Sequence, residues 1–382
     1  MPIVSYFLST TDDPIDQDHS LWHLPLPDSR LPAEKKSDAL DTETVTYGSY
    51  FSAVSKFCAT DGWDRIIKAA SSKLEQPLVE NDLQEVSIFL EKHGAFYHPA
   101  LLQVAIENKR LSFVVNVAAS NHGRRTLSRE VKALKRLNDQ RPFGWFPTVY
   151  SSTSDELPMF LGDWFDGFHE FHLTRRPGSD NPVIVVWDGA ATRSVLSEKQ
   201  AADLYRNAAM ILTACYDPLT SCQIFPWHHA AGDFVVRVEG DGVTVRLITV
   251  RNYLPLSGCA AEPGDERAIL EALMIFFIHL SVRMRLDRLD GVSEVAWASD
   301  HCLASVADGF LLGLDLTARM SGFPETFPDT FRQFFNHHDG KVLLAMARRI
   351  TEAVFDQRTE ERRLIDRHLV RHIHEIIQLF TA

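Results

Sequence analysis

The segment PWHHAAGDFVV, residues 226–236, is the most informative part of this 382-residue chain for its fold. Two histidines, three small residues and an acid lead here directly into an apolar strand. Small residues let a ligand approach the backbone closely, and Asp233 at the start of the strand can accept a metal ion or a hydrogen-bond donor. Polar loops between apolar elements often carry function. The alternative is structural: Asp233 caps a turn, and His228 and His229 bond to backbone groups.

The elements around this loop predict an α+β protein. Downstream, a turn at 240–242 and an apolar run over 243–250 predict a β-hairpin. Upstream, Ser197 caps a predicted helix, and a β-hairpin within 96–120 precedes a helix over 126–138. Further strands are predicted over 146–150, 159–165 and 182–187, and further helices over 265–288, 299–319, 326–335, 339–354 and 358–380.

The composition along the chain predicts four parts. Residues 1–45 are rich in Asp, Ser and Pro and predict a loosely ordered N-terminal arm. Residues 46–95 predict a helical extension, because apolar residues within 82–92 recur at a spacing of three and four. Residues 96–165 then form a small β-rich lobe, and residues 166–382 form a large helical lobe.

The overall composition excludes some classes of protein and of partner. A hydrophobic fraction of 45% excludes a disordered chain. The net charge of −12 argues against nucleic acid as a partner, because backbone phosphates favour a surplus of Lys and Arg. A small molecule or a nucleotide fits this charge if a local basic pocket exists, and a protein partner remains open.

The cysteines and the apolar segments predict a cytoplasmic protein. Five scattered cysteines without a C-x-x-C pair fit a reducing compartment and argue against a disulfide framework or a structural zinc site. The first residues lack the basic region of a signal peptide and run into acidic Asp12 and Asp13. The most apolar stretch, 268–280, is far shorter than a membrane span. We therefore expect no membrane association.

Sequence motifs for common catalytic chemistry are missing. The chain contains no G-x-G-x-x-G, no G-x-x-x-x-G-K-[ST], no G-x-S-x-G and no H-E-x-x-H. The order of the predicted elements is therefore the remaining indication of function.

That order resembles the protein-kinase-like fold, in the wide sense that includes the aminoglycoside and choline phosphotransferases. The resemblance covers about residues 96–350 and implies a two-lobed architecture. In the family pattern H-G-D-x-x-x-x-N followed by three apolar residues, Asp233 stands at the metal-binding asparagine and His228 at the catalytic aspartate. Glu130, on the inward stripe of the helix over 126–138, resembles the glutamate that pairs with the family's nucleotide-binding lysine.

The chain also departs from the family pattern. No lysine follows the strand over 113–119, and bulky residues replace the glycine-rich loop. Thr249 stands where the magnesium-binding aspartate is expected, and Arg251 is either a compensating cation or a surface residue. Phosphoryl transfer depends on metal and cationic neutralisation of the phosphates, so these losses weaken ordinary chemistry with ATP and Mg²⁺. The resemblance implies His228 and Asp233 as catalytic candidates, Asp233 as metal ligand, and Glu130, Thr249 and Arg251 as cofactor-binding residues.

The sequence therefore predicts a pseudokinase-like binder of a nucleotide or small molecule, with an atypical phosphotransferase as the alternative. A metal-dependent hydrolase is a further alternative, because imidazoles and an acid could surround a divalent ion. Its ligands would be His169, His172, His228, His229 and Asp233. A structural adaptor that uses the N-terminal arm and the C-terminal helices also remains open.

Overall fold

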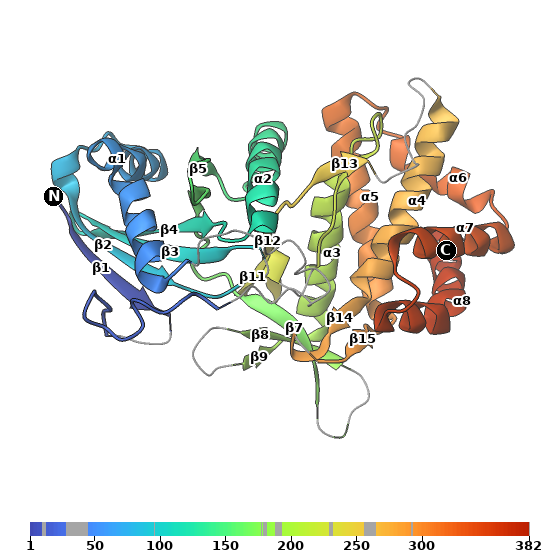
Figure 1. Ribbon diagram of the computed structural model, residues 1–382. Helices are drawn as coiled ribbons and strands as arrows, with labels where there is room; N and C mark the ends of the chain where they lie inside the picture. Colours follow the sequence, from blue (N-terminus) through green and yellow to red (C-terminus); the bar gives the residue numbers. More distant parts are fainter. Residues whose placement is uncertain are drawn as a thin grey trace. The chain divides into compact units, whose positions relative to one another are not determined.

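The computed structural model describes most of the chain, and Figure 1 colours its elements from the N-terminus to the C-terminus. The chain divides into two compact units, residues 1–140 with 147–166 and residues 141–146 with 167–382. Both units combine helices with strands, which confirms the α+β class. The described residues are 1–9, 13–27, 45–94, 96–176, 178, 182–187, 193–228, 232–255, 265–291 and 293–381.

A mixed sheet forms the centre of the first unit. Its six strands in the described residues have the order β1-β2-β3-β4-β6-β5, and only β1 and β2 run parallel to each other. Every second residue of β3 is buried, because successive side chains of a strand point to opposite faces. The strands are β1 (Ile3–Leu8), β2 (Leu83–Leu90), β3 (His98–Ile106), β4 (Lys109–Val117), β5 (Val149–Thr153) and β6 (Met159–Asp163).

Two helices accompany this sheet. Helix α1 (Tyr47–Leu74) contributes its apolar side chains to the same core as the strands. It begins in a capping box, in which the Ser49 N–H donates to Thr46 Oγ1 at 3.1 Å and the Thr46 N–H donates to Ser49 Oγ at 2.8 Å. Helix α2 (Asn121–Gln140) confirms the helix predicted over 126–138.

The helix expected over 82–92 is wrong, so residues 46–95 are not a purely helical extension. This segment forms the short 3₁₀ turn η2 (Glu80–Asp82) and then strand β2. Val86, Ser87 and Ile88 are buried in succession, which means that both faces of the strand are covered there. A strand covered on both faces loses the two-residue alternation, and its apolar spacing resembles that of a helix.

The loosely ordered arm expected over 1–45 is also wrong for its described residues. Strand β1 pairs with β2 along its whole length. The Trp22 ring stacks on Phe51 of α1, with ring centroids 6.4 Å apart. Aromatic burial therefore ties this segment to the core of the first unit. Residues 10–12 and 28–44 lie outside the described part of the chain.

The second unit is mainly helical and also contains short sheets. The predicted division at 165–166 falls beside the boundary between the units at Asp166, although residues 141–146 belong to the second unit. The helices are α3 (Glu198–Ala214), α4 (Glu266–Met284), α5 (His301–Ser321), α6 (Phe327–Asn336), α7 (Gly340–Val354) and α8 (Glu360–Thr381). The strands are β7 (Glu170–Arg175), β8 (Pro182–Trp187), β9 (Arg193–Val195), β10 (Cys222–Ile224), β11 (Phe234–Glu239), β12 (Gly242–Leu247), β13 (Tyr253–Pro255), β14 (Leu286–Arg288) and β15 (Val295–Trp297), and the 3₁₀ turn η4 is Leu289–Gly291.

Helices α3 and α5 approach each other closely at two glycines. A Cβ atom on Gly309 would lie 2.1 Å from the Arg206 carbonyl oxygen, and one on Gly313 would lie 2.6 Å from the Met210 carbonyl oxygen. The missing side chains allow the two backbones to make contact. None of the helices in the described part of the chain combines the length and apolar character that crossing a membrane requires.

Candidate functional site

The candidate loop lies in the second unit, between β10 and β11. Trp227 is buried and places its ring edge-on to Phe234, with centroids 6.3 Å apart. The Ile248 N–H donates to the Asp233 carbonyl oxygen at 2.8 Å. These contacts hold Trp227 against β11 and Asp233 against the segment that follows β12. His229, Ala230 and Ala231 lie outside the described residues.

Asp233 is bound on both carboxylate oxygens by protein groups. Arg251 Nη1 lies 2.6 Å from Oδ2, and Arg251 Nη2 lies 2.5 Å from Oδ1. The His228 N–H also donates to Oδ2, at 2.8 Å. The exposed fractions of the two side chains are 2% for Asp233 and 15% for Arg251, so this bidentate pair is shielded from water. A metal ion could reach this carboxylate only by displacing Arg251.

The structure therefore brings three of the predicted site residues together. His228 and Asp233 come from the loop, and Arg251 comes from the segment between β12 and β13. Thr249 is half-buried on the same segment. The structural alternative, in which Asp233 caps a turn, agrees in part with the structure, because the Asp233 side chain accepts a hydrogen bond from the His228 N–H.

Glu130, the remaining predicted residue, lies on α2 in the first unit. Its side chain is buried and accepts a hydrogen bond from the Tyr97 hydroxyl at 2.6 Å. The sequence assigned Glu130 to cofactor binding, and in the structure its carboxylate accepts from a tyrosine hydroxyl of the same unit.

A cavity of about 310 Å³ opens beside the loop, wholly within the second unit. Its lining mixes aromatic rings with charged groups, as small-molecule sites do. The residues that matter most for its chemistry are Trp227, His228, Arg283, Asp287, Phe355 and Glu361. They come from the loop, the end of α4, β14, the residue after α7 and the start of α8.

Of the two arginines that line this cavity, Arg288 pairs with Glu361 and Arg283 lies among aromatic rings. Its guanidinium carbon lies 5.0 Å from the ring centroid of Phe225, 6.0 Å from that of Trp227 and 5.2 Å from that of Phe355. Burial lowers the pKa of Arg283 to about 10, so the group stays charged at neutral pH. Its buried Nε has no hydrogen-bond partner within the described residues. Aromatic rings hold the cation in place but leave its N–H donors for an anion.

Two titratable groups with shifted pKa values lie beside Arg283. His228 lines the cavity at an exposed position, where desolvation by neighbouring groups and then the Arg283 charge lower its pKa to about 4. Its imidazole is therefore neutral at pH 7 and only a weak base. Burial raises the pKa of Asp287 to about 7, although its carboxyl accepts the Leu173 N–H at 2.8 Å and the Arg288 N–H at 2.6 Å. Asp287 thus changes charge near neutral pH.

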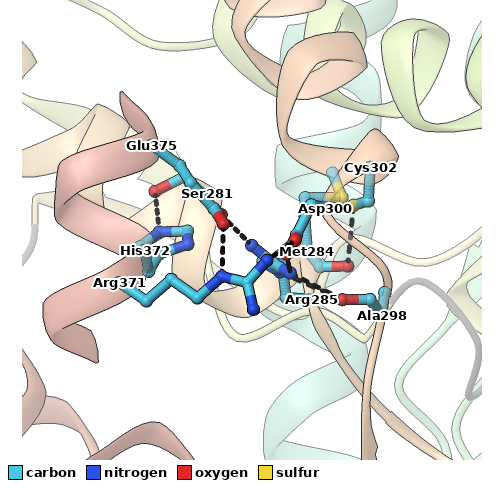
Figure 2. A network of polar contacts seen from close by, with 9 residues as sticks. All are labelled: Ser281, Met284, Arg285, Ala298, Asp300, Cys302, Arg371, His372 and Glu375. Atoms are coloured by element: carbon cyan, nitrogen blue, oxygen red, sulfur yellow. Dashed lines mark hydrogen bonds and ion pairs between the residues drawn. The ribbon is translucent and has the colours of Figure 1, made fainter. Parts of the chain in front are cut away.

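An ion-pair network fixes the chain between Arg283 and Asp287 (Figure 2). Arg285 is only 2% exposed, and its guanidinium lies 2.5 Å from Asp300 and 3.0 Å from Glu375. Its Nε and Nη2 also donate to the Ala298 carbonyl oxygen, at 3.1 and 2.9 Å. Arg371 of α8 bonds to the same two carboxylates. The network ties α4 to α8 and so orients the cavity wall.

Histidine and acidic side chains do not assemble a metal centre in the described part of the chain. His169 exchanges backbone hydrogen bonds with Val236 at 2.9 Å, and the His172 ring packs edge-on to Trp187 with centroids 4.6 Å apart. His229, a predicted ligand of the hydrolase alternative, lies outside the described residues.

Arg283 and Asp287 escaped the sequence-based prediction. The signal that could have found them is the run RMRLDR, residues 283–288, which follows the most apolar helix of the chain. Charges gathered directly after a buried helix must be paired, exposed or held at a site. Here all three occur, since Arg285 is paired, Arg288 is exposed and Arg283 faces the cavity.

Comparison with known proteins adds no relative. Neither the models of known protein families nor the curated proteins contain a match to this chain.

Proposed function

We propose that this protein is a pseudokinase-like binding protein that holds a small molecule and does not transfer phosphoryl groups. The observation that carries the proposal is the buried bidentate pair between Arg251 and Asp233. The cavity beside the loop is the binding site that we propose.

The state of Asp233 supports a binding role over catalysis. Removing one partner of a buried ion pair costs about 3–5 kcal/mol, because the other charge is left uncompensated. Magnesium would have to offset that loss to take Asp233 from Arg251. At Thr249, where a second carboxylate would be needed, the chain offers only a hydroxyl. These residues therefore do not fit the Mg²⁺–ATP arrangement of the kinase-like family.

The size and lining of the cavity support a small-molecule ligand. A volume of about 310 Å³ lies at the lower end of the range for ligand pockets. The site also has an apolar wall and a few convergent polar groups, the combination that gives both affinity and orientation.

Thermal stabilisation of the full chain tests this proposal. The probes are Mg²⁺–ATP, the twenty common amino acids, and short carboxylic acids and amines. Val354→Phe fills the cavity from the end of α7, whereas Val342→Phe adds the same bulk at an exposed position of the same helix. We expect at least one probe to raise the Tm of the wild type and of Val342→Phe but not of Val354→Phe.

Two results would overturn the proposal. The first is the absence of stabilisation by every probe, or equal stabilisation of both valine variants. The second is transfer of the ATP γ-phosphoryl group to water or to an added acceptor, with loss of that activity in Asp233→Asn. The second result would instead establish the atypical phosphotransferase.

A further inference from the structure

We propose that the cavity beside Trp227 binds a small zwitterion of the α-amino acid class with an apolar side chain. Arg283 would take the carboxylate, and the carboxyl group of Asp287 would face the ammonium. This inference rests on the proposed function, because it names the ligand of the same cavity.

Arg283 is the group that would bind the anionic end of the ligand. The three rings around its guanidinium exclude water from much of the group, but an aromatic face accepts hydrogen bonds only weakly. The described residues place no carboxylate within ion-pair distance of Arg283, whose Nε is buried without a partner. A ligand carboxylate would supply the charge-assisted hydrogen bonds that the protein itself does not.

Asp287 is the group that would bind the cationic end of the ligand. Arg288 already pairs with Glu361, at 3.2 Å between Nη2 and Oε1. Arg358 pairs with Asp356, at 3.6 Å between Nε and Oδ1. Among the described residues, Asp287 is then the lining acid and Arg283 the lining cation that no ion pair engages. A dianion such as a phosphate would meet Arg283 as the one lining cation of the described residues that no ion pair engages, and a simple cation would be repelled by Arg283. A ligand that carries both charges meets a complementary group at each end.

The state of Asp287 agrees with this assignment. Burial keeps a proton on its carboxyl up to about pH 7 in the absence of a ligand. An ammonium group nearby would favour the ionised form and so form an ion pair. The charged groups that face this site from neighbouring elements are Arg283 of α4, Arg288 of β14, Glu361 of α8 and Asp356 between α7 and α8.

The apolar lining indicates what the ligand carries between its charges. Leu286, Val295, Phe355 and Trp227 supply aliphatic and aromatic surface to the cavity. Such a wall favours an apolar side chain, because burying apolar surface is favourable and an unpaired polar group is costly.

Isothermal titration calorimetry with matched half-ligands tests the inference. The first set is L-leucine, 3-methylbutylamine and 4-methylpentanoate, and the second is L-phenylalanine, 2-phenylethylamine and 3-phenylpropanoate. We expect one of the amino acids to bind, and each of its half-ligands to bind about tenfold more weakly or worse, because each lacks one charge-assisted contact.

Variants assign the two ends of the ligand. Arg283→Met keeps the apolar stem and should abolish amino acid binding without changing the affinity for the amine, while Arg283→Lys should restore part of it. Asp287→Asn should weaken the amino acid but not the acid half-ligand. The matched control is Arg348→Met on the exposed face of α7, which should bind as the wild type does. A thermal melt shows whether each variant is folded.

The outcomes separate this inference from the proposed function. If the acid alone binds as tightly as the amino acid, the cavity is an anion site, and if the amine alone does so, it is a cation site. Either result overturns the zwitterion. A further outcome is that no amino acid binds, while another probe stabilises the wild type and not Val354→Phe. That result would support the proposed binding function and exclude amino acids as the ligand class. If no probe binds, both proposals fail.

Discussion

Arg251 and Asp233 lie 18 residues apart in the sequence and form a bidentate ion pair across the end of the β11–β12 hairpin. The hairpin reverses the chain after Asp233, and the segment beyond β12 returns to deliver the guanidinium to the carboxylate. Asp233, which the sequence predicted as a metal ligand, is therefore bound by Arg251.

We expect Arg251→Met to lower the free energy of unfolding by about 3–5 kcal/mol, because it leaves the Asp233 charge buried without its partner. Urea denaturation measures the change. The control is Lys199→Met, which removes an exposed ion pair with Asp241 and should change stability by about 0–1 kcal/mol. Equal effects of the two substitutions would show that the Arg251 pair is not a buried anchor.

Gly309→Ala tests the close contact between α3 and α5. Helix propensity alone predicts a gain of about 1 kcal/mol, since alanine is the better helix former. We expect a loss of roughly 1–3 kcal/mol instead, because the new Cβ would meet the Arg206 carbonyl oxygen. The control Asp308→Ala changes the adjacent, exposed position of α5. A stabilised Gly309→Ala protein would mean that the two helices do not pack in this way.

Asp287 is expected to make the protein less stable as the pH rises. Its pKa is raised from an ordinary value near 4 to about 7, so between these values the native state holds a proton that the unfolded state has released. Each unit of the shift corresponds to about 1.4 kcal/mol. The free energy of unfolding of Asp287→Asn, relative to that of the wild type, should therefore be a few kcal/mol higher at pH 8 than at pH 5.

The comparison for Asp287 is a difference of differences, so other titrating groups cancel. The same two measurements on the exposed variant Asp308→Asn provide the reference. A stability difference between Asp287→Asn and wild type that is the same at both pH values would rule out a buried, protonated carboxyl.

His372 is expected to make the protein less stable as the pH falls. Ser281 Oγ donates to the Ile278 carbonyl oxygen at 2.9 Å, so the His372 Nε2–H must donate to that same Oγ, also at 2.9 Å. Burial lowers the pKa of His372 to about 3, which leaves the native state with fewer protons than the unfolded state between about pH 6.5 and 3. Stability should fall as the pH falls through this window.

His372→Gln keeps a donor for Ser281 and removes the titrating ring. We expect thermal melts to show a smaller drop in Tm between pH 7 and pH 4 for this variant than for the wild type. Some acid sensitivity should remain, because burial also lowers the pKa of His279 to about 3. An unchanged drop would place the acid-sensitive groups elsewhere.

The sequence predicted those elements whose patterns are local. Helices α4 to α8 follow long apolar stripes, and the Ser197 cap locates the start of α3, as expected from the capping rules. Strand β2 escaped prediction because its burial depends on β1 and β3, which come from distant parts of the chain. Residues covered on both faces have no polar side to reveal their period.

The sequence predicted only those features of the candidate site that depend on nearby residues. His228, Asp233 and Arg251 stood out as polar or charged residues beside apolar strands, and they do meet in the second unit. The sequence did not show that Arg251 binds Asp233, because that pairing requires the hairpin between them to close. It also did not show Arg283 and Asp287 in the same cavity as His228, because the loop and the end of α4 are joined only by folding.

The sequence by itself determined the α+β class, the helical C-terminal region and the candidate loop, since each depends on residues within one or two turns of the chain. Only the tertiary structure decided what the charges of that loop do. Burial and pairing are properties of the space around a side chain, and they bind Asp233 to Arg251 while leaving Arg283 facing a cavity. A charged residue in a sequence is therefore a candidate, and its neighbours in the fold decide whether it holds the structure or a ligand.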